Sequence, residues 1–340
     1  MPVATASAIR TPAAAPRRPW ALLGALALLA AAAFALALSV GTAGPPPGAL
    51  WRSLVAGSDP LVRSLVLDLR LPRALTAFGT GALLALAGVA MQVLLRNPLA
   101  DPYVLGVSGG AAVAALACML LGLGTLAVQV GASLGALAAV LLVFALAHGR
   151  GGWTPTRLLL TGVVVAAGTG ALVSLLLALG DPTRLRGMLF WLMGDLAYAG
   201  SPWPLLALAG VATPLGIGAA RGLNVLARGD AQAALLGVAV GPMRLALYIA
   251  ASLCTAATVT SVGSIGFVGL VTPHLVRLAG ATDHRWLVPA AALAGGTLVV
   301  LADVIARTAF APRQLPVGAL IALVGVPLFL VLMRRTRAVA

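Results

Sequence analysis

Long apolar runs, separated by short polar segments, follow one another along the whole chain. The run from Ala74 to Leu95 is typical, with Arg70 and Arg73 before it and Arg96 after it. About 20 apolar residues in a helix match the ~30 Å hydrocarbon core of a bilayer. The runs lack the apolar–polar alternation of membrane barrel strands. The predicted fold class is therefore all-α, a polytopic membrane protein built from transmembrane helices.

The apolar runs predict about ten spans, so both chain ends are expected on the cytoplasmic side. The spans are expected at 20–40, 72–95, 104–123, 126–147, 155–179, 203–221, 244–262, 265–280, 286–306 and 316–333. Together, residues 20–335 are expected to form one transmembrane domain. The Ala/Pro/Arg-rich residues 1–19 are expected to be a disordered cytoplasmic N-terminus. The first run is longer than the 7–15 apolar residues of a usual signal peptide, which disfavours cleavage.

Composition agrees with a chain that lies mainly in lipid. Residues are 61% hydrophobic and only 9% charged, and the mean hydropathy is +1.07. Soluble domains carry about 25% charged residues. The net charge of +14 does not indicate nucleic-acid binding, because the arginines stand at the ends of apolar runs, as in loops that face the cytoplasm and anionic lipid.

Residue usage excludes several classes of chemistry. All 22 basic residues are arginine and all 8 acidic residues are aspartate. Without lysine the chain cannot be a P-loop ATPase, and without glutamate it has no H-E-x-x-H metal site. Cys118 and Cys254 lie inside apolar runs without C-x-x-C spacing, which disfavours a disulfide or metal site. His274 and His284 are expected in a solvated turn rather than at a metal.

A polar interruption at about 222–243 stands out between two late spans. Asp230 is expected to cap a short helix that ends at Gly237. A short amphipathic helix pair on the cytoplasmic side would suit docking of a partner. An ordinary loop remains the alternative.

Several segments together resemble the FecCD-type permeases of binding-protein-dependent ABC importers, the group that includes the cobalamin permease BtuC. The matching segments are RLPRAL (70–75), GALLALAGVAMQ (81–92), RNPLADPYVLGVSGGA (96–111), GSIGFVGLVTPHLVRLAGATDHR (263–285), LADVIAR (301–307) and QLPVGALIALVGVPLFLVLMRR (314–335). They cover most of the chain after residue 65 in the family's order. The resemblance is specific for the family and not for the substrate.

The resemblance implies a BtuC-like type II ABC importer fold in the bacterial cytoplasmic (inner) membrane. The implied partners are a second permease subunit, forming a homodimer, two cytoplasmic ATPase subunits and a periplasmic or lipid-anchored substrate-binding protein. The implied cargo is a metal chelate, most often a ferric siderophore, with haem and cobalamin open. The chain itself is expected to be non-catalytic and to hold no cofactor.

The resemblance also carries roles for individual residues. Binding-protein docking is expected at Arg70, Arg73 and Arg307, whose guanidinium groups offer a planar fork to carboxylates. Arginines that snorkel to lipid headgroups are the alternative. ATPase coupling is expected at Arg228, Gly229, Asp230, Ala231, Ala234, Leu235 and Gly237. The cytoplasmic gate is expected at Asn97, Leu99 and Thr156, although Pro155 departs from the family's pattern, in which a hydroxyl residue is common.

Asp303 is the best ionisable candidate inside a span, and such residues are often functional. Arg307 follows it by four residues, so a structural ion pair on one helical face is the other interpretation. An ion-coupled secondary transporter would suit a mid-membrane carboxylate and inverted repeats. No repeat is visible in the sequence, which ranks this alternative behind the importer.

Overall fold

The computed structural model describes residues 19–41, 48, 50–52, 59–149, 153–197 and 200–337, with side chains up to residue 331. Apart from Pro19, the predicted disordered N-terminus at 1–19 lies outside these residues. The structure confirms the all-α class, because the described ranges hold helices and no strand. The α-helices are α1 (Pro19–Ser39), α3 (Pro60–Ser64), α4 (Leu71–Leu94), α5 (Val107–Leu120), α6 (Thr125–Ala147), α7 (Pro155–Ala178), α8 (Pro182–Leu192), α9 (Trp203–Gly218), α10 (Ala220–Leu226), α11 (Asp230–Leu235), α12 (Val240–Val262), α13 (Val268–Leu278), α14 (His284–Thr308) and α15 (Val317–Arg337). A π-helical segment η1 (Leu65–Arg70) joins α3 to α4, and a 3₁₀ turn η2 (Pro102–Leu105) precedes α5.

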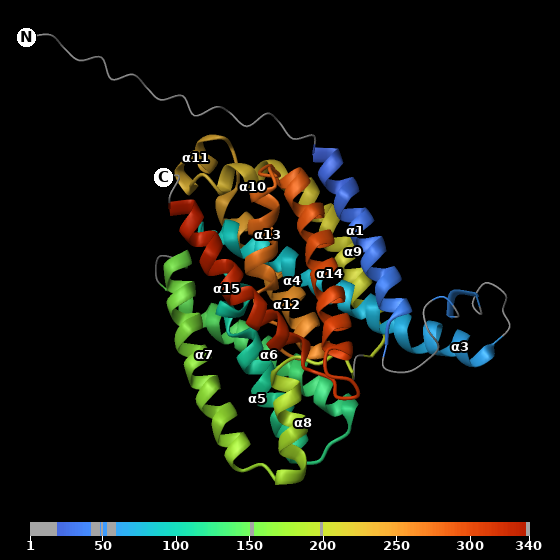
Figure 1. Ribbon diagram of the computed structural model, residues 1–340. Coiled ribbons are helices and arrows are strands. Elements are labelled where there is room, and N and C mark those ends of the chain that lie inside the picture. Colours follow the sequence, from blue (N-terminus) through green and yellow to red (C-terminus); the bar gives the residue numbers. More distant parts are fainter. Residues whose placement is uncertain are drawn as a thin grey trace, which may run out of the picture.

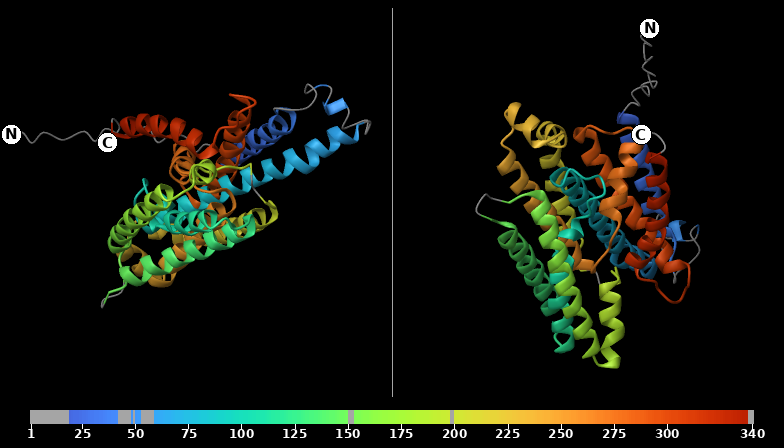
Figure 2. Two further views of the ribbon diagram at one scale, coloured as in Figure 1. Left: turned by 90° about the horizontal axis from the view of Figure 1, so that it is seen from below. Right: turned by 90° about the vertical axis from the view of Figure 1, so that its left-hand side faces the viewer.

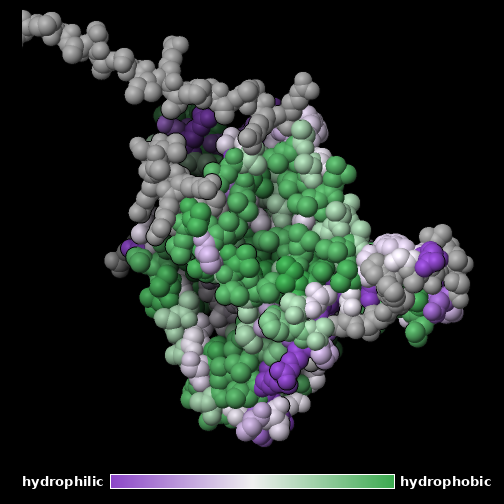
Figure 3. Space-filling view, in the orientation of Figure 1, coloured by the Kyte–Doolittle hydropathy of each residue, from purple (hydrophilic) through white to green (hydrophobic). Residues whose placement is uncertain are grey.

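Each of the ten predicted spans contains an apolar helix. Among the described residues, 6 helices are long and apolar enough to cross a bilayer, and α9 with α10 makes a further candidate bent by 66°. Three shorter apolar helices, within α5, α13 and α15, account for the remaining predicted spans. Hydrophobic side chains cover most of the face shown in Figure 3. The exterior is therefore suited to lipid.

The helix before the second predicted crossing starts earlier than expected. Helical structure runs without a break from Pro60 to Leu94, over 35 residues. Asp59 accepts the backbone N–H of Leu61 at 2.9 Å and caps this start, and Pro60 occupies the first turn, where a missing N–H costs nothing. Arg70 and Arg73 consequently lie inside a long helix and not at its end, which corrects the predicted boundary at residue 72.

Helix α4 forms the centre of the bundle, and almost every residue from Ala74 to Leu94 is buried. It runs from α3 at the edge of the molecule into the middle, between α14, α12, α13 and α9 (Figures 1 and 2). Two glycines bring backbones into contact. A Cβ at Gly81 would lie 2.0 Å from the Gly295 carbonyl oxygen of α14, and one at Gly88 1.9 Å from that of Gly269 in α13. Small residues at these positions thus let helices approach closely in lipid.

We expect Gly88→Ala to lower the thermal unfolding temperature in detergent, because the new Cβ meets backbone that cannot rotate away. Overpacking of this kind costs about 1–3 kcal/mol. Gly24→Ala in α1 is the matched control, since an added Cβ there meets nothing within 4 Å. The control should unfold at the parental temperature or slightly above it. An unchanged unfolding temperature for Gly88→Ala would contradict the close approach of α4 and α13.

The two ends of the bundle differ in what they display (Figure 1). One end carries α10, α11, the start of α1 and the end of α15, and we call it the α11 end. The opposite end carries α8, and we call it the α8 end. The sequence did not predict α8, whose Pro182 follows Asp181 as Pro60 follows Asp59.

Candidate functional site

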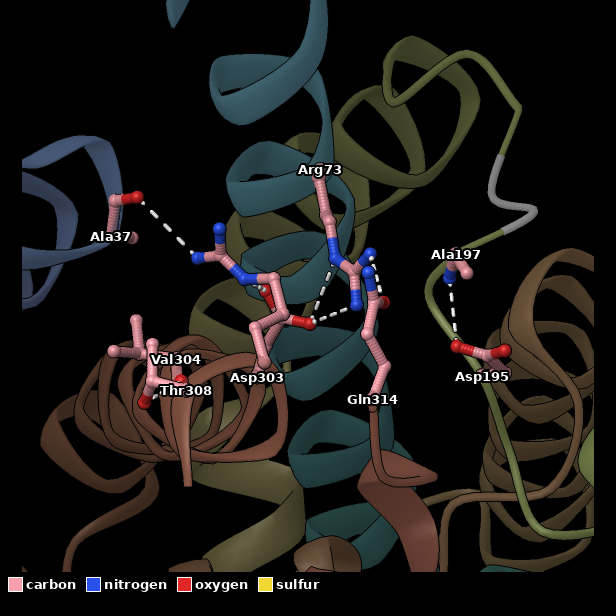
Figure 4. A network of polar contacts seen from close by, with 9 residues as sticks. Ala37, Arg73, Asp195, Ala197, Asp303, Val304, Thr308 and Gln314 are labelled. Carbon is pink, nitrogen blue, oxygen red and sulfur yellow. Dashed lines mark hydrogen bonds and ion pairs between the residues drawn. The ribbon is translucent and has the colours of Figure 1, made fainter. Parts of the chain in front are cut away.

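A buried carboxylate organises the polar residues toward the α8 end. Asp303 of α14 is 1% exposed. Its Oδ1 accepts a hydrogen bond from Arg73 Nε of α4 at 2.9 Å, and Arg73 Nη2 lies 2.9 Å from the same oxygen. Its Oδ2 lies 3.0 Å from Arg307 Nε, one helical turn away. Figure 4 shows Arg73 reaching Asp303 from the neighbouring helix. The predicted pair of Asp303 and Arg307 is thus confirmed, and Arg73 joins it.

Two of the arginines also bind the end of α1. Arg70 Nη1 donates to the carbonyl oxygens of Leu38 at 2.6 Å and Ser39 at 3.2 Å. Arg307 Nη2 donates to the carbonyl of Ala37 at 3.4 Å. These carbonyls belong to the last turn of a helix, where no intrahelical N–H is left to bind them. Positive charge is also favourable there.

The predicted docking arginines therefore take part in an intramolecular cluster. Arg70 and Arg307 are buried, at 5% and 7% exposure. Arg73 is the most accessible of the three, with 15% of its side chain exposed. Its Nη1 donates to Gln314 Oε1 at 3.1 Å, in the segment between α14 and α15 (Figure 4). Docking by these three residues stays a prediction.

Asp195 lies beyond this cluster, in the segment after α8, and was not among the predicted site residues (Figure 4). Its Oδ1 accepts the N–H of Ala197 at 2.8 Å. Burial raises the pKa of the Asp195 carboxyl, and the positive charge of Arg73 opposes that rise. With Arg184 of α8, Asp195 lines a cavity of about 500 Å³ between the α8-end parts of α6, α8 and α12. Asp195 could not be singled out from sequence because its segment shows no motif.

The polar interruption at 222–243 folds into α10, α11 and the start of α12 at the α11 end. Gly229 precedes α11 with φ 132°, a conformation that favours glycine. Gly237 follows the helix with φ 79°, and its N–H donates to Ala234 O at 3.0 Å. The short helix is thus present, but it ends at Leu235 with Leu236 at its C-cap, two residues before the predicted end at Gly237.

The predicted capping role of Asp230 is wrong. Gly229 occupies the cap position, and Asp230 is the first residue of α11. The carboxylate of Asp230 forms an ion pair with Arg244 of α12 and lies 3.5 Å from Arg96 Nη2. Two guanidinium groups lie beside this carboxylate, and two opposite full charges attract each other more strongly than a carboxylate attracts a neutral N–H.

Helix α11 presents apolar side chains outward. Ala233 is buried in the main core, whereas Leu235 and Leu236 are 88% and 70% exposed. Four further predicted coupling residues are also exposed, namely Arg228, Ala231, Ala234 and Gly237. A short helix anchored on one face and apolar on the other is suited to a hydrophobic groove in a partner.

The predicted gate residues fall into two places. Asn97 Oδ1 accepts the N–H of Leu99 at 2.9 Å, so Asn97 holds a tight turn after α4. Leu99 is 38% exposed. We call residues 96–99 the gate turn, and Arg96 joins it to α11 through Asp230. Thr156 lies exposed in the first turn of α7, where Thr154 accepts the N–H of Arg157 at 3.3 Å.

The expectation of a solvated turn is wrong for His284. It is 5% exposed, its Nδ1 lies 2.6 Å from Asn224 Oδ1, and Asn224 Nδ2 donates to Asp283 Oδ1 at 2.9 Å. The Asn224 bond holds the pKa of Asp283 below its usual value. This network joins α10 to α14. Within the described ranges no three His, Cys, Asp or Glu residues are grouped to hold a metal.

Comparisons with known proteins agree with these features. The FecCD transport family matches residues 28–335. The hemin transport system permease protein HmuU of Yersinia pestis is 41% identical over 327 residues, which are 93% of this chain and 94% of HmuU. The vitamin B12 import system permease protein BtuC of Shigella boydii is 39% identical over 298 residues, which are 85% of this chain and 90% of BtuC.

A solved structure shares the fold. It is described as an inward-facing conformation of a putative metal-chelate type ABC transporter, with a TM-score of 0.79 and 31% identity. The alignment covers 93% of this chain and 99% of that one. The extent of this alignment shows that the helical arrangement of the described residues is that of an ABC transporter permease. This chain belongs to the FecCD transport family.

Proposed function

We propose that this chain is the permease subunit of an importer that carries a metal chelate into the cytoplasm, driven by a separate ATPase. The single observation that carries the proposal is the exposed apolar face of α11, anchored by Ala233 and displaying Leu235. It occurs in a FecCD-family chain without lysine, which cannot itself hold a P-loop. An energy-supplying partner is therefore required, and α11 offers the surface for it.

The complete transporter would hold two copies of this chain, two ATPase subunits at the α11 end and a binding protein at the α8 end. This arrangement puts both chain termini in the cytoplasm, in the bacterial inner membrane. Binding-protein docking is assigned to Arg73 with Gln314, which are the accessible part of the cluster. Arg70 and Arg307 would contribute to docking only indirectly, by supporting the cluster, because both are buried.

The alternative of an ion-coupled secondary transporter has little support from the geometry. A carboxylate that binds and releases a coupling ion needs access to a water-filled path. Asp303 is 1% exposed and engaged by two arginines. Its place in the fold favours a structural role.

Uptake measurements test the proposed function and separate the cargo classes. A strain lacking this chain would be supplied with a labelled ferric hydroxamate siderophore, haem or cobalamin, with and without a plasmid copy. We propose the ferric siderophore as cargo, and the names of HmuU and BtuC make haem and cobalamin the other two arms. Restored uptake of one chelate supports the proposal. Restored uptake of none of them, with the ATPase and binding protein present, would overturn it.

A further inference from the structure

The Asp230 carboxylate joins three elements at the α11 end. It opens α11, pairs with Arg244 near the start of α12, and lies 3.5 Å from Arg96 Nη2 in the gate turn. These contacts connect α11, the helix proposed to bind the ATPase, with the gate turn, which is predicted to close the cytoplasmic end of the transport pathway. The sequence assigned Asp230 to coupling and left Arg96 without a role there.

The backbone at Arg96 is held in an uncommon conformation. Its φ is 49°, in the left-handed region that non-glycine residues rarely occupy. The Asn97 N–H donates to Gln92 O at 3.1 Å and closes the end of α4. From this turn the Arg96 side chain reaches the Asp230 carboxylate.

The end of α4 is fixed from the other side. Gln92 is 4% exposed, its Nε2 donates to Gly269 O and Leu270 O, each at 3.4 Å, and its Oε1 accepts from Arg277 of α13. The end of α4 is therefore fixed to α13. The gate turn that follows it is exposed.

The two ion pairs of Asp230 differ in accessibility. The Arg244 side chain is 15% exposed, whereas that of Arg96 is 42% exposed and Asp230 is 35% exposed. Exposed pairs are weak and are readily exchanged. The Arg244 pair therefore suits a permanent anchor of α11 on α12. The Arg96 pair suits a contact that forms in one state and breaks in another.

We propose that Asp230 is a positioning residue that couples α11 to the cytoplasmic gate through Arg96. When the ATPase shifts α11, the ion pair transmits the shift to the gate turn and changes the exposure of Leu99. This inference rests on the proposed function and names its mechanical link. No substrate is needed to test it, because the moving part can be observed directly.

The test follows labelling of a cysteine at the gate turn in the assembled transporter. Leu99→Cys would be introduced with Cys118→Ala and Cys254→Ala, and its rate of labelling by a membrane-impermeant maleimide measured with and without ATP and vanadate. Arg96→Gln is the test variant, and Arg221→Gln on exposed α10 is the matched control. Coupling free energies correspond to about 5–150-fold changes. The nucleotide effect is the change in labelling rate caused by ATP and vanadate. We expect Arg96→Gln to reduce it about fivefold, at the low end of that range, and Arg221→Gln to preserve it.

A double-mutant cycle shows whether Arg96 acts through Asp230. In an Asp230→Asn background, Arg96→Gln should cause no further loss of the nucleotide effect, because the contact is already gone. ATPase co-purification should persist in Arg96→Gln, since the Arg244 anchor is intact. A full nucleotide effect in Arg96→Gln, or additive losses in the double variant, would overturn the inference. Failure of the parental chain to bind any ATPase would instead count against the proposed function.

Discussion

Replacing Asp303 with alanine is expected to destabilise the bundle by about 3–5 kcal/mol, the cost of breaking a buried ion pair by removing one partner. The carboxylate is 1% exposed and is shared by Arg73 and Arg307. Without it, two guanidinium groups remain close together away from water, and like charges repel. The unfolding temperature in detergent and the yield of folded protein measure the effect.

Two variants separate charge from packing in this prediction. Asp303→Asn preserves the shape and some hydrogen bonding of the side chain. Its decrease in unfolding temperature should therefore be smaller than that of Asp303→Ala but still measurable. Asp181→Ala removes an exposed aspartate before α8 that makes no capping bond, and it should leave the unfolding temperature unchanged. A parental unfolding temperature for Asp303→Ala would mean that the cluster does not hold α4 against α14.

The sequence predicted those parts of the molecule that depend on local pattern. Apolar runs located the apolar helices that match the ten predicted spans, because hydrophobic length is a property of the segment itself. The pair of Asp303 and Arg307 followed from i,i+4 spacing on one helix. Arg73 is 230 residues from Asp303 along the chain, so no local rule could join them.

Local rules failed where a distant group competed for the same atoms. Asp230 has the residue type and position of a helix cap, yet Arg244, 14 residues later, takes its carboxylate. Arg70 and Arg307 look like outward charges at the ends of spans, yet the carbonyl groups of α1 bind them inside the bundle. In each case the packing of helices, which the linear pattern does not contain, decided the partner.

The start of α3 and the start of α8 were missed for a different reason. Both begin with aspartate followed by proline, a combination typical of helix starts. The surrounding residues are too polar to read as a span, so a search for apolar runs passes over them. Applying the capping rule to every Asp-Pro pair would have found both helices.

Leu235→Asp is expected to abolish stable assembly with the ATPase while the permease itself folds normally. Leu235 is 88% exposed on α11, and Ala233 on the same helix anchors it in the core. A buried charge in the centre of an interface would replace an apolar contact, and truncation of a central contact residue costs at least about 2 kcal/mol, or roughly thirtyfold in affinity. Co-purification of the tagged ATPase, quantified against the permease, measures the loss.

The matched control places the same change on α3, at the edge of the molecule and away from α11 (Figure 1). Leu61 of α3 is 79% exposed and far from α11 (Figure 1), so Leu61→Asp adds the same charge without touching the proposed ATPase surface. It should co-purify with the ATPase as the parental chain does. Leu235→Ala should have an intermediate effect, because it removes apolar area without adding charge. Equal ATPase recovery with Leu235→Asp and Leu61→Asp would show that the ATPase binds elsewhere, and the exposed face of α11 would then need another partner.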